Sequence, residues 1–405
     1  MERIVMKFGG TSVANPERIA RAAKLVLAEV NQGNQVAVIV SAMGKTTDDL
    51  LRLAEEINPK AARRELDMLL STGEQVTASL LAMAIGAQGL KAHSYTGWQA
   101  GVTTEAIHGN ARIEQVNADK IISTIESGAV AVITGFQGID NYGELTTLGR
   151  GGSDTSAVAI AIALDAAVCD IYTDVEGVFT TDPRLIGQAK KLEEISYDEM
   201  LEIANLGAGV LHPRAVEFAK NHHMPMRVRP AHMDGEGTVI KEEINLENNL
   251  IVRGIAFERD IVRITVMYEV PYNGSLANIF TALANHHVNV DIIVQTIMEG
   301  VQPSVSFSIK KEDFAEAINI LEIEKEALGY SRADFEVGLA KVSIVGSGMV
   351  SNPGVAAQMF EILRGASVPV KMVSTSEIKV SVVIPESDIE IAVAALHKQF
   401  GLDAD

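Results

Sequence analysis

The sequence predicts a three-layer α/β domain with a mostly parallel sheet, followed by two copies of a small βαββαβ sandwich. Through about residue 230, short apolar β-branched runs alternate with helical patterns, and these runs are apolar at successive positions. Strands of that kind are covered on both faces, which is typical of a parallel sheet between helix layers. Beyond residue 250 the sequence repeats itself after 80 residues, which indicates two copies of one unit.

The elements of the first domain follow from these patterns. Strands are predicted at residues 4–8, 35–40, 130–134 and 170–173. Helices are predicted at residues 17–30, 61–84, 115–127 and 155–164. Ligands of such sheets bind beyond the carboxyl ends of the strands. We expect the site there, because three polar or glycine motifs each follow directly on a predicted strand: Gly9-Gly10, Ser41 and Gly135.

The repeat is recognised from matching glycine and apolar positions. Gly274, Ala277, Phe280, Leu283, Val288 and Val290 recur as Gly354, Ala357, Phe360, Leu363, Val368 and Val370. Each copy is predicted as a strand, a glycine-containing loop, a helix and a strand, with a further strand and helix behind. A polar, glycine-containing stretch marks the linker between the domains. We expect domains at residues 1–233, 250–330 and 331–405, with the linker at 234–249.

Composition excludes several classes of protein. Hydrophobic residues make up 47% of the 405 residues, but no apolar run reaches the ~20 residues of a membrane span. A net charge of −19 argues against nucleic acid or an anionic membrane as the main partner. The single cysteine, Cys169, fits a reducing compartment, and the apolar start is too short for a signal peptide. We expect a cytoplasmic protein that binds neither membrane nor nucleic acid.

The segment Thr146–Asp154 has the composition of an anion site. Its glycines allow backbone N–H groups to approach a phosphate or carboxylate, and the Arg150 guanidinium suits the same anions. Ser153 or Asp154 can cap the Ala-rich helix that follows, whose N-terminus also favours anions. The alternative interpretation is an ordinary glycine-rich turn between a strand and a helix.

Other candidates flank the predicted strand ends. Lys7 lies at the end of the first strand, before Gly9 and Gly10, where it would neutralise transferring phosphate oxygens. The alternative is a structural lysine, which would need a carboxylate partner. Three further candidates could instead be helix caps or solvated residues: Ser41, Thr47 and Glu74.

The segment Thr173–Arg184 leaves a strand and ends in an acid-proline-arginine cluster. It carries Asp174 directly after the strand and Asp182 near its end. Such a segment could hold a ribose and a polyphosphate, whereas the alternative is a polar β-turn loop. His222-His223 has no acid or cysteine at ligand spacing, so we assign no metal ligands.

Taken in order, these motifs resemble those of the aspartate kinases, and the repeat resembles their paired ACT regulatory domains. The resemblance covers essentially the whole chain. It is carried by Lys7-Phe8-Gly9-Gly10-Thr11-Ser12, Val40-Ser41-Ala42, Gly73-Glu74, Thr147–Asp154, Thr173–Arg184, Val210–Arg214 and Val373–Ile378. The chain resembles the monofunctional, lysine-sensitive type, which is not fused to a dehydrogenase, because it ends at Asp405. The first domain is therefore expected to have the amino acid kinase fold.

The resemblance implies transfer of the ATP γ-phosphoryl group to the β-carboxylate of L-aspartate, with Mg²⁺, to give 4-phospho-L-aspartate. That reaction is the first step of the aspartate-derived pathway to lysine, threonine and methionine. Two anions must meet, so the protein would supply positioning and positive charge rather than a covalent nucleophile. The alternative is a non-catalytic amino acid sensor, which should have lost charge at Lys7, Arg150 or Asp154, whereas all three are present.

The resemblance also assigns roles to the site residues. Lys7 would stabilise the transferred phosphoryl group, and Asp154 would organise the site around the amino group and magnesium. Arg150 would hold the α-carboxylate of aspartate and Glu74 its amino group. Three residues would orient the remaining polar atoms: Ser41, Thr47 and Ser153. ATP would be bound by Lys7, Gly9, Gly10, Thr173, Asp174, Phe179, Asp182 and Arg184.

The sequence departs from the family's commoner pattern at several points, one of which is Arg229-Pro230-Ala231-His232 in place of a Ser-rich stretch. Phe179 stands where tyrosine is frequent, and Gly209 stands where many relatives have an ATP-contacting lysine. Pro271 stands where an acidic residue often helps to hold an effector amine. Lysine, threonine or both are therefore candidates for the effector.

Effector binding is expected in the first copy of the repeat. Gly274-Ser275 opens a helix whose amides could receive an amino acid carboxylate, and Asn289, Asp291 and Gln295 could bind the effector's polar end. The alternative is that these residues only cap the sandwich. ACT sheets in this family pair across chains, so we expect a homodimer or a larger assembly, in which an effector inhibits by population shift.

Overall fold

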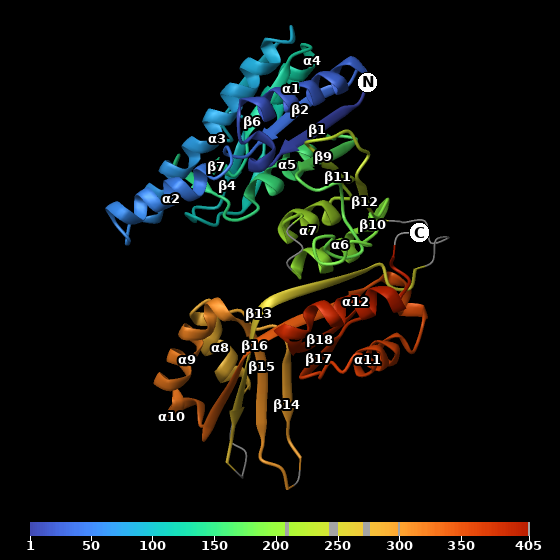
Figure 1. The fold of residues 1–405 in the computed structure, drawn as a ribbon. Helices are drawn as coiled ribbons and strands as arrows, with labels where there is room; N and C mark the ends of the chain where they lie inside the picture. Colours follow the sequence, from blue (N-terminus) through green and yellow to red (C-terminus); the bar gives the residue numbers. More distant parts are fainter. Residues whose placement is uncertain (207–209, 243–249, 270–275, 299, 404–405) are drawn as a thin grey trace. The chain divides into compact units, whose positions relative to one another are not determined.

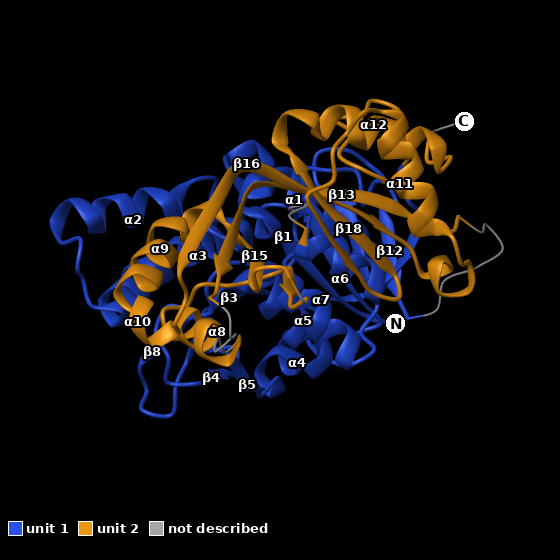
Figure 2. Ribbon diagram, turned by 90° about the horizontal axis from the view of Figure 1, so that it is seen from below, with its two compact units in different colours: residues 1–179, 191–205, 209–247 blue, residues 180–190, 206–208, 248–405 orange. Residues whose placement is uncertain are grey.

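The computed structural model (Figure 1) describes residues 1–206, 210–242, 250–269, 276–298 and 300–403. The chain divides into two compact units, which are coloured separately in Figure 2. The first unit comprises residues 1–179, 191–205 and 209–247, and the second comprises residues 180–190, 206–208 and 248–405. The short segment 180–190 therefore leaves the first unit and belongs to the second.

The first unit is built on an eight-stranded sheet with the strand order β10-β12-β11-β9-β1-β2-β6-β3 (Figure 1). Neighbouring strands are parallel except for β11 and β12. Its strands are β1 Arg3–Phe8, β2 Gln35–Val40, β3 Ala92–Tyr95, β6 Val130–Thr134, β9 Val168–Thr173, β10 Glu194–Ser196, β11 Met226–Pro230 and β12 Thr238–Lys241. The four strands predicted from the sequence are confirmed as β1, β2, β6 and β9.

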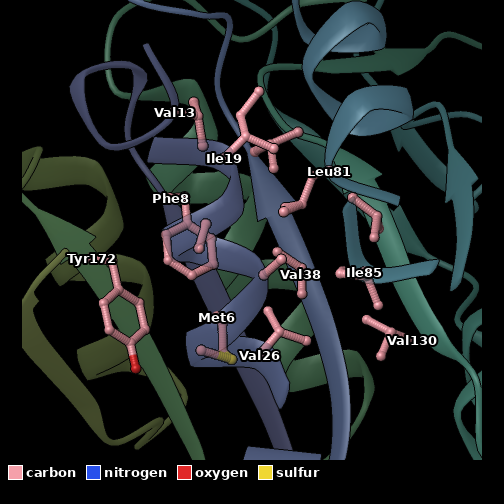
Figure 3. Close-up of a cluster of buried hydrophobic side chains, with 14 of the residues drawn as sticks. Met6, Phe8, Val13, Ile19, Val26, Val38, Leu81, Ile85, Val130 and Tyr172 are labelled. Carbon is pink, nitrogen blue, oxygen red and sulfur yellow. The ribbon is translucent and has the colours of Figure 1, made fainter. Parts of the chain in front are cut away.

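Helices cover both faces of this sheet. Figure 3 shows side chains of α1 (Pro16–Asn31) and α3 (Arg63–Gly86) converging on Met6 and Phe8 of β1. Successive side chains of a strand point to opposite faces, so Lys7 points away from this core, toward α5 (Gly152–Ala163). The other helices are η1 Gly10–Val13, α2 Thr46–Ile57, α4 Asp119–Glu126, α6 Tyr197–Asn205 and α7 Pro213–Asn221.

A smaller sheet with the order β5-β4-β7-β8 completes the first unit. Its strands are β4 Val102–Thr104, β5 Ile113–Val116, β7 Gln137–Ile139 and β8 Leu145–Thr147. The helix predicted at 115–127 begins later than expected, at Asp119, because Ile113–Val116 pairs with β4 instead. The other three predicted helices are confirmed as α1, α3 and α5, with ends shifted by one to three residues.

Among the described residues, α3 is the one helix long and apolar enough to cross a membrane by length and composition. It is a core helix of the first unit, however, since Leu81 and Ile85 belong to the core of Figure 3. It also buries the carboxyl groups of Asp67 and Glu74. Both carboxyl groups contribute to the candidate site described below.

The second unit is a six-stranded sheet with the order β14-β15-β13-β16-β18-β17, in which all neighbours are antiparallel (Figure 1). Its strands are β13 Gly254–Met267, β14 Ile293–Thr296, β15 Ser304–Lys310, β16 Arg332–Val345, β17 Met372–Thr375 and β18 Lys379–Pro385. Its helices are α8 Leu276–Asn285, η2 Lys311–Asp313, α9 Phe314–Ile323, α10 Lys325–Leu328, η3 Ser347–Ser351, α11 Val355–Gly365, η4 Glu386–Asp388 and α12 Ile389–Gln399. This arrangement contains the predicted pair of sandwiches.

The two sandwiches exchange strand segments. Val252, just before β13, and Ile255, at its start, lie in the core formed by α11 and α12 of the second copy. Conversely, Tyr330 lies in the core of the first copy, and Ala333 at the start of β16 packs against it. Each copy thus completes its sheet with a strand segment from the other copy: the start of β13 in the second copy and the start of β16 in the first. The predicted domain boundary at residue 330 did not include this exchange.

Residues 234–249, predicted as a linker, include a strand of the first unit. β12 pairs with β10 and β11, and Thr238 within it is fully buried. The Thr238 hydroxyl donates to the Leu192 carbonyl at 2.6 Å, which fixes β12 in the unit. Residues 243–249 lie outside the described residues.

Candidate active site

The centre of the candidate site is a buried ion pair between β1 and α5. The Lys7 Nζ and Asp154 Oδ1 atoms are 2.6 Å apart, and about 11% and 12% of the two side chains are exposed. The structure therefore supplies the carboxylate partner that a buried lysine needs. That partner is itself one of the two predicted catalytic residues. The pair places a positive and a negative group next to each other at the end of the central strand.

The turn before α5 requires glycine at Gly149 and Gly151. Their φ angles are 75° and 68°, in the left-handed region that favours glycine. A Cβ atom on Gly151 would lie 2.1 Å from the His212 ring, so a side chain cannot fit there. Between them, Arg150 is exposed and makes no hydrogen bond or ion pair with any other residue described in the structure. Its guanidinium is available for a carboxylate or phosphate.

Glu74 projects from α3 to the loop after β2. Its Oε1 atom accepts a hydrogen bond from the Ala42 N–H at 3.1 Å, and its Oε2 atom is buried without a partner among the described residues. Burial raises the pKa of Glu74 to about 7. A buried carboxylate oxygen without a donor is costly, so this site favours a bound cation such as an ammonium group.

The loops after β1 and β2 pack closely. The Ser41 N–H donates to the Phe8 carbonyl at 3.1 Å, and the Gly44 N–H donates to the Gly10 carbonyl at 3.0 Å. A Cβ atom on Gly10 would lie 2.8 Å from the Ala42 carbonyl oxygen, so glycine is required for this close approach. The structure thereby brings three predicted residues to one edge of the sheet: Gly9, Gly10 and Ser41. Ser153 is buried in the first turn of α5, and Thr47 is half-buried in the first turn of α2.

Asp67, which we did not predict from the sequence, anchors the strand that leads into the Arg150 turn. Its fully buried carboxylate accepts hydrogen bonds from the Thr147 hydroxyl at 2.6 Å, the Thr147 N–H at 3.1 Å and the Gly109 N–H at 3.0 Å. The His108 Nδ1 atom lies 3.0 Å from the same carboxylate. Asp67 follows Arg63, Arg64 and Glu65 in a charged first turn, so no local pattern in the sequence distinguishes it.

Two residues at the start of α7 also support the turn and were missed. The Arg214 guanidinium donates to the Leu148 carbonyl at 2.8 Å and to the Ala111 carbonyl at 3.2 Å. Burial lowers the pKa of His212, whose ring lies against Gly151. Both belong to the sequence Leu211-His212-Pro213-Arg214, whose proline begins α7. These contacts hold the peptide groups on either side of the Arg150 turn.

A second buried charge cluster lies on β9 and β11. The Asp170 carboxylate is fully buried and accepts from Arg227 Nε at 2.6 Å and from a second Arg227 nitrogen at 2.7 Å. Arg229 reaches the same carboxylate at 3.2 Å and lies over the Tyr172 ring, 5.4 Å from its centroid. This cluster fixes β9 next to β11. It is a structural network that holds the strand from which Thr173 and Asp174 follow.

The predicted ATP residues are divided between the two units. Thr173 ends β9, which pairs with β1 in register, and its hydroxyl donates to the Asp174 carboxylate at 3.1 Å. Phe179 also belongs to the first unit, whereas Asp182 and Arg184 belong to the second. The Arg184 side chain makes a two-pronged ion pair with Asp182, at 3.0 and 2.8 Å, which lowers the pKa of that carboxyl group. Gly209 lies outside the described residues.

The predicted effector residues are described in part. Gly274, Ser275 and Pro271 lie outside the described residues. Asn289 and Asp291 are exposed just before β14, and Gln295 lies within that strand. The Asp291 carboxylate pairs with Lys341 of β16, whose Nζ atom also lies 2.9 Å from Glu258 of β13. No group of three or more His, Cys, Asp or Glu side chains that could hold a metal occurs in the part of the chain that the structure describes.

Comparisons with known proteins identify the family of this chain. The amino acid kinase family model matches residues 2–230, and an ACT domain model matches residues 342–400. An aspartokinase of Bacillus sp. (strain MGA3) is 58% identical over 402 residues, which cover 99% of this chain and 98% of the relative. Aspartokinase 2 of Bacillus subtilis (strain 168) is 57% identical over 402 residues, with the same two coverages.

Solved structures give the same result for the fold. Aspartokinase III of E. coli, in complex with aspartate and ADP in its R-state, matches with a TM-score of 0.81 and 27% identity. The match covers 98% of this chain and 99% of that one. The same enzyme in complex with lysine and aspartate, in its T-state, has a TM-score of 0.78 and 27% identity, with coverages of 99% and 100%.

The fold and the matched family model together show that this chain belongs to the amino acid kinase family. Within that family the chain is a member of the aspartokinases that carry an ACT domain, as the resemblance of its motifs had predicted.

Proposed function

We propose that this chain transfers the γ-phosphoryl group of ATP to the β-carboxylate of L-aspartate, giving 4-phospho-L-aspartate and ADP. The observation that carries the proposal is the buried Glu74 Oε2 atom, which has no partner among the described residues. An α-ammonium group supplies the cation that this oxygen lacks. The proposed phosphoryl transfer is the first step of the pathway from aspartate to lysine, threonine and methionine.

The substrate is held by groups of opposite charge at its two ends. Glu74 binds the α-ammonium group, and the exposed Arg150 guanidinium binds the α-carboxylate in a two-pronged contact. Ser41, Thr47 and Ser153 orient the remaining polar atoms. The β-carboxylate oxygen is then free to attack the γ-phosphorus, and the bond to the β,γ-bridging oxygen breaks.

Lys7 and Asp154 act on the transferred group. The Lys7 ammonium offsets the charge of the phosphoryl oxygens as the two anions approach. Asp154 organises the site around the substrate amino group and Mg²⁺, for which a carboxylate oxygen is a preferred ligand. Mg²⁺ bound with ATP would supply positive charge to its phosphates. Burial of the Lys7–Asp154 pair strengthens these electrostatic effects.

ATP is proposed to bind beyond the ends of β1 and β9. Lys7, Gly9, Gly10, Thr173 and Asp174 lie at or directly after these neighbouring strand ends. Phe179 supplies a stacking surface, and Asp182 and Arg184 complete the predicted set. The backbone N–H groups of the turn at Gly9 and Gly10 can approach the phosphates closely, because neither residue has a side chain.

Regulation is proposed to act through the second unit. Lysine, threonine or both bind at Asn289, Asp291 and Gln295, together with Gly274 and Ser275, and inhibit by favouring a less active state. The lysine complex of E. coli aspartokinase III supports lysine as one effector. A homodimer or larger assembly is supported by apolar residues exposed on the edge strands β14 and β17: Ile293, Val294 and Val373. The proposed location is the cytoplasm.

Trapping the acyl phosphate with hydroxylamine tests the proposal. The reaction contains ATP, Mg²⁺ and either L-aspartate or L-glutamate, each with and without lysine and threonine. Hydroxamate formed from aspartate alone, and suppressed by either amino acid, is the expected result. Folded protein that gives no product from either acceptor would refute the proposal and favour a non-catalytic sensor.

A matched pair of arginine variants tests the assigned site. Arg150→Ala should lose about 1.5–3 kcal/mol of aspartate binding, seen as a raised KM for aspartate, because it removes hydrogen bonds to a charged group. Arg52→Ala is the control, because Arg52 is exposed on α2 and pairs only with neighbouring acids of the same helix. Equal KM values in both variants would contradict the role of Arg150.

A further inference from the structure

The segment Thr180–Lys190 carries two of the proposed ATP residues but is packed within the second unit. The chain leaves the first unit after Phe179 and re-enters it at Lys191, and these two residues form an antiparallel bridge. One residue further on, the Thr180 N–H donates to the Lys190 carbonyl at 2.9 Å. The segment is therefore a closed loop whose two ends are adjacent, and it contains Asp182 and Arg184.

The loop is attached to the second ACT domain at several points. Leu185 and Ile186 pack against the apolar core formed by α11 and α12. The Ile255 N–H, at the start of β13, donates to the Thr180 carbonyl at 2.7 Å. Ala189 forms an antiparallel bridge with Asp403, near the end of the described chain. These contacts fix the backbone of the loop at both ends and in the middle.

A chain of polar groups, buried except for the exposed Asp403 carboxylate, joins the loop to α12. His397 of α12 is fully buried, and its Nδ1 atom lies 2.8 Å from an Asp403 carboxylate oxygen. Its Nε2 atom lies 2.9 Å from the hydroxyl of Thr180, which is also fully buried. The same hydroxyl accepts the Lys190 N–H at 3.0 Å. With Asp403 accepting the Nδ1 proton, the Nε2 lone pair is left as an acceptor for the Thr180 hydroxyl proton, for which the Leu402 carbonyl, at 3.3 Å, is a second acceptor.

A histidine is not needed here for packing alone. Leu185, Ile186 and Leu402 already supply apolar contacts around α12, and an imidazole buried among them costs free energy unless both nitrogens are bonded. A fully satisfied buried network favours a single arrangement of the groups it joins. His397 joins the first residue of the loop, through Thr180, to the C-terminal segment, through Asp403.

We infer that His397 is a positioning residue for ATP, which holds the Thr180–Lys190 loop in the conformation that presents Asp182 and Arg184. The inference rests on the proposed function. When a ligand binds only one conformation, its apparent affinity falls in proportion to the fraction of molecules in that conformation. Loss of one buried hydrogen bond changes such an equilibrium by about three- to tenfold, and the ATP affinity falls by that factor where the conformation that binds ATP is then the minor one. ATP affinity thereby depends on the folded state of the second ACT domain.

Two pairs of variants test this inference in the full-length protein. Thr180→Val removes the hydroxyl and Thr180→Ser keeps it. His397→Leu removes both polar contacts, whereas His397→Gln keeps a polar atom near the Nε2 position. We expect Thr180→Val and His397→Leu to raise KM for ATP by about three- to tenfold, with kcat and KM for aspartate changed less than twofold. The serine and glutamine variants should recover much of the ATP affinity.

His286→Gln is the matched control, because His286 is an exposed imidazole of the second unit that lies 3.0 Å from Glu316. Calorimetric titration with Mg-ATP gives the same affinities without turnover, and thermal unfolding identifies any variant that does not fold. If His397→Leu fails to fold, the two Thr180 variants decide the question.

Three results would overturn the inference: unchanged ATP affinity in folded Thr180→Val, an equal loss in His286→Gln, or a loss of kcat and both KM values together. The proposed function fails separately, if the wild-type protein traps no acyl phosphate. In that case the calorimetric ATP affinities of the same variants still test the role of His397.

Discussion

Replacing Glu74 by glutamine is expected to weaken aspartate binding and to stabilise the unliganded protein. The side chain is almost fully buried, and one carboxylate oxygen has no partner among the described residues. Glutamine has the same shape and keeps an oxygen for the Ala42 N–H, but it lacks the charge. The two effects have one cause, because the buried charge that binds the substrate ammonium is costly when the site is empty.

The structure gives the size of both effects. Burial raises the Glu74 pKa from 4.5 to about 7, which corresponds to about 3 kcal/mol in favour of the protonated form. A carboxyl group with a raised pKa contributes stability that is present below pH 4.5 and lost as the pH rises through about 7. At pH 8, Glu74→Gln should therefore unfold with a free energy up to about 3 kcal/mol higher than the wild type. Loss of the charged hydrogen bond should cost about 1.5–3 kcal/mol in aspartate affinity.

Two measurements on the same preparations check this prediction. Urea unfolding at pH 4 and pH 8 gives the free energies of unfolding, and steady-state kinetics with varied aspartate gives KM. The stability difference between variant and wild type should be large at pH 8 and small at pH 4. A variant that is less stable than the wild type at pH 8 would contradict the cost assigned to the buried charge, and one that keeps its KM for aspartate would show that the Glu74 charge does not bind the substrate.

The remaining predictions concern pH, the glycine turn and the effector. KM for aspartate should rise as the pH falls below about 7 in the wild type, because protonation of Glu74 removes the charge, and this dependence should be absent in Glu74→Gln. Gly151→Ala should cost more than about 2 kcal/mol of stability, since its Cβ atom would lie 2.1 Å from the His212 ring. Gly143→Ala, also at positive φ but in open space, should cost only about 1 kcal/mol, as urea unfolding of both will determine. Asp291→Asn should raise the lysine concentration needed for half-inhibition at least tenfold in the hydroxamate assay, and an unchanged value would exclude Asp291 from the effector site.

The fold was predictable because its main strands are apolar at successive positions. β1, β2, β6 and β9 are each buried over most of their length, so their composition alone separates them from amphipathic strands. The helix predicted at 115–127 was partly wrong, because Ile113–Val116 is half exposed and its strand conformation depends on pairing with β4. Tertiary contacts of that kind have no local signal.

The candidate site residues could be named one by one from the sequence, but their contacts with one another could not. Lys7, Glu74 and Arg150 stand out by chemistry in apolar or glycine-rich surroundings. The pairing of Lys7 with Asp154 depends on how α5 packs across β1, which spans 147 positions in the sequence. Asp67 was missed for the same reason, since its partners Thr147 and Gly109 lie 80 and 42 residues away.

The strand exchange in the second unit determines where this chain can be divided. A polypeptide that stops at residue 330 would keep α8 and α9 but lose Ala333 and the rest of β16, the last strand of the first sandwich. A polypeptide that starts at residue 331 would lack Val252 and Ile255 from the core of the second. Both cores are complete only when the two sandwiches are present together. The two sandwiches should therefore unfold in one cooperative step.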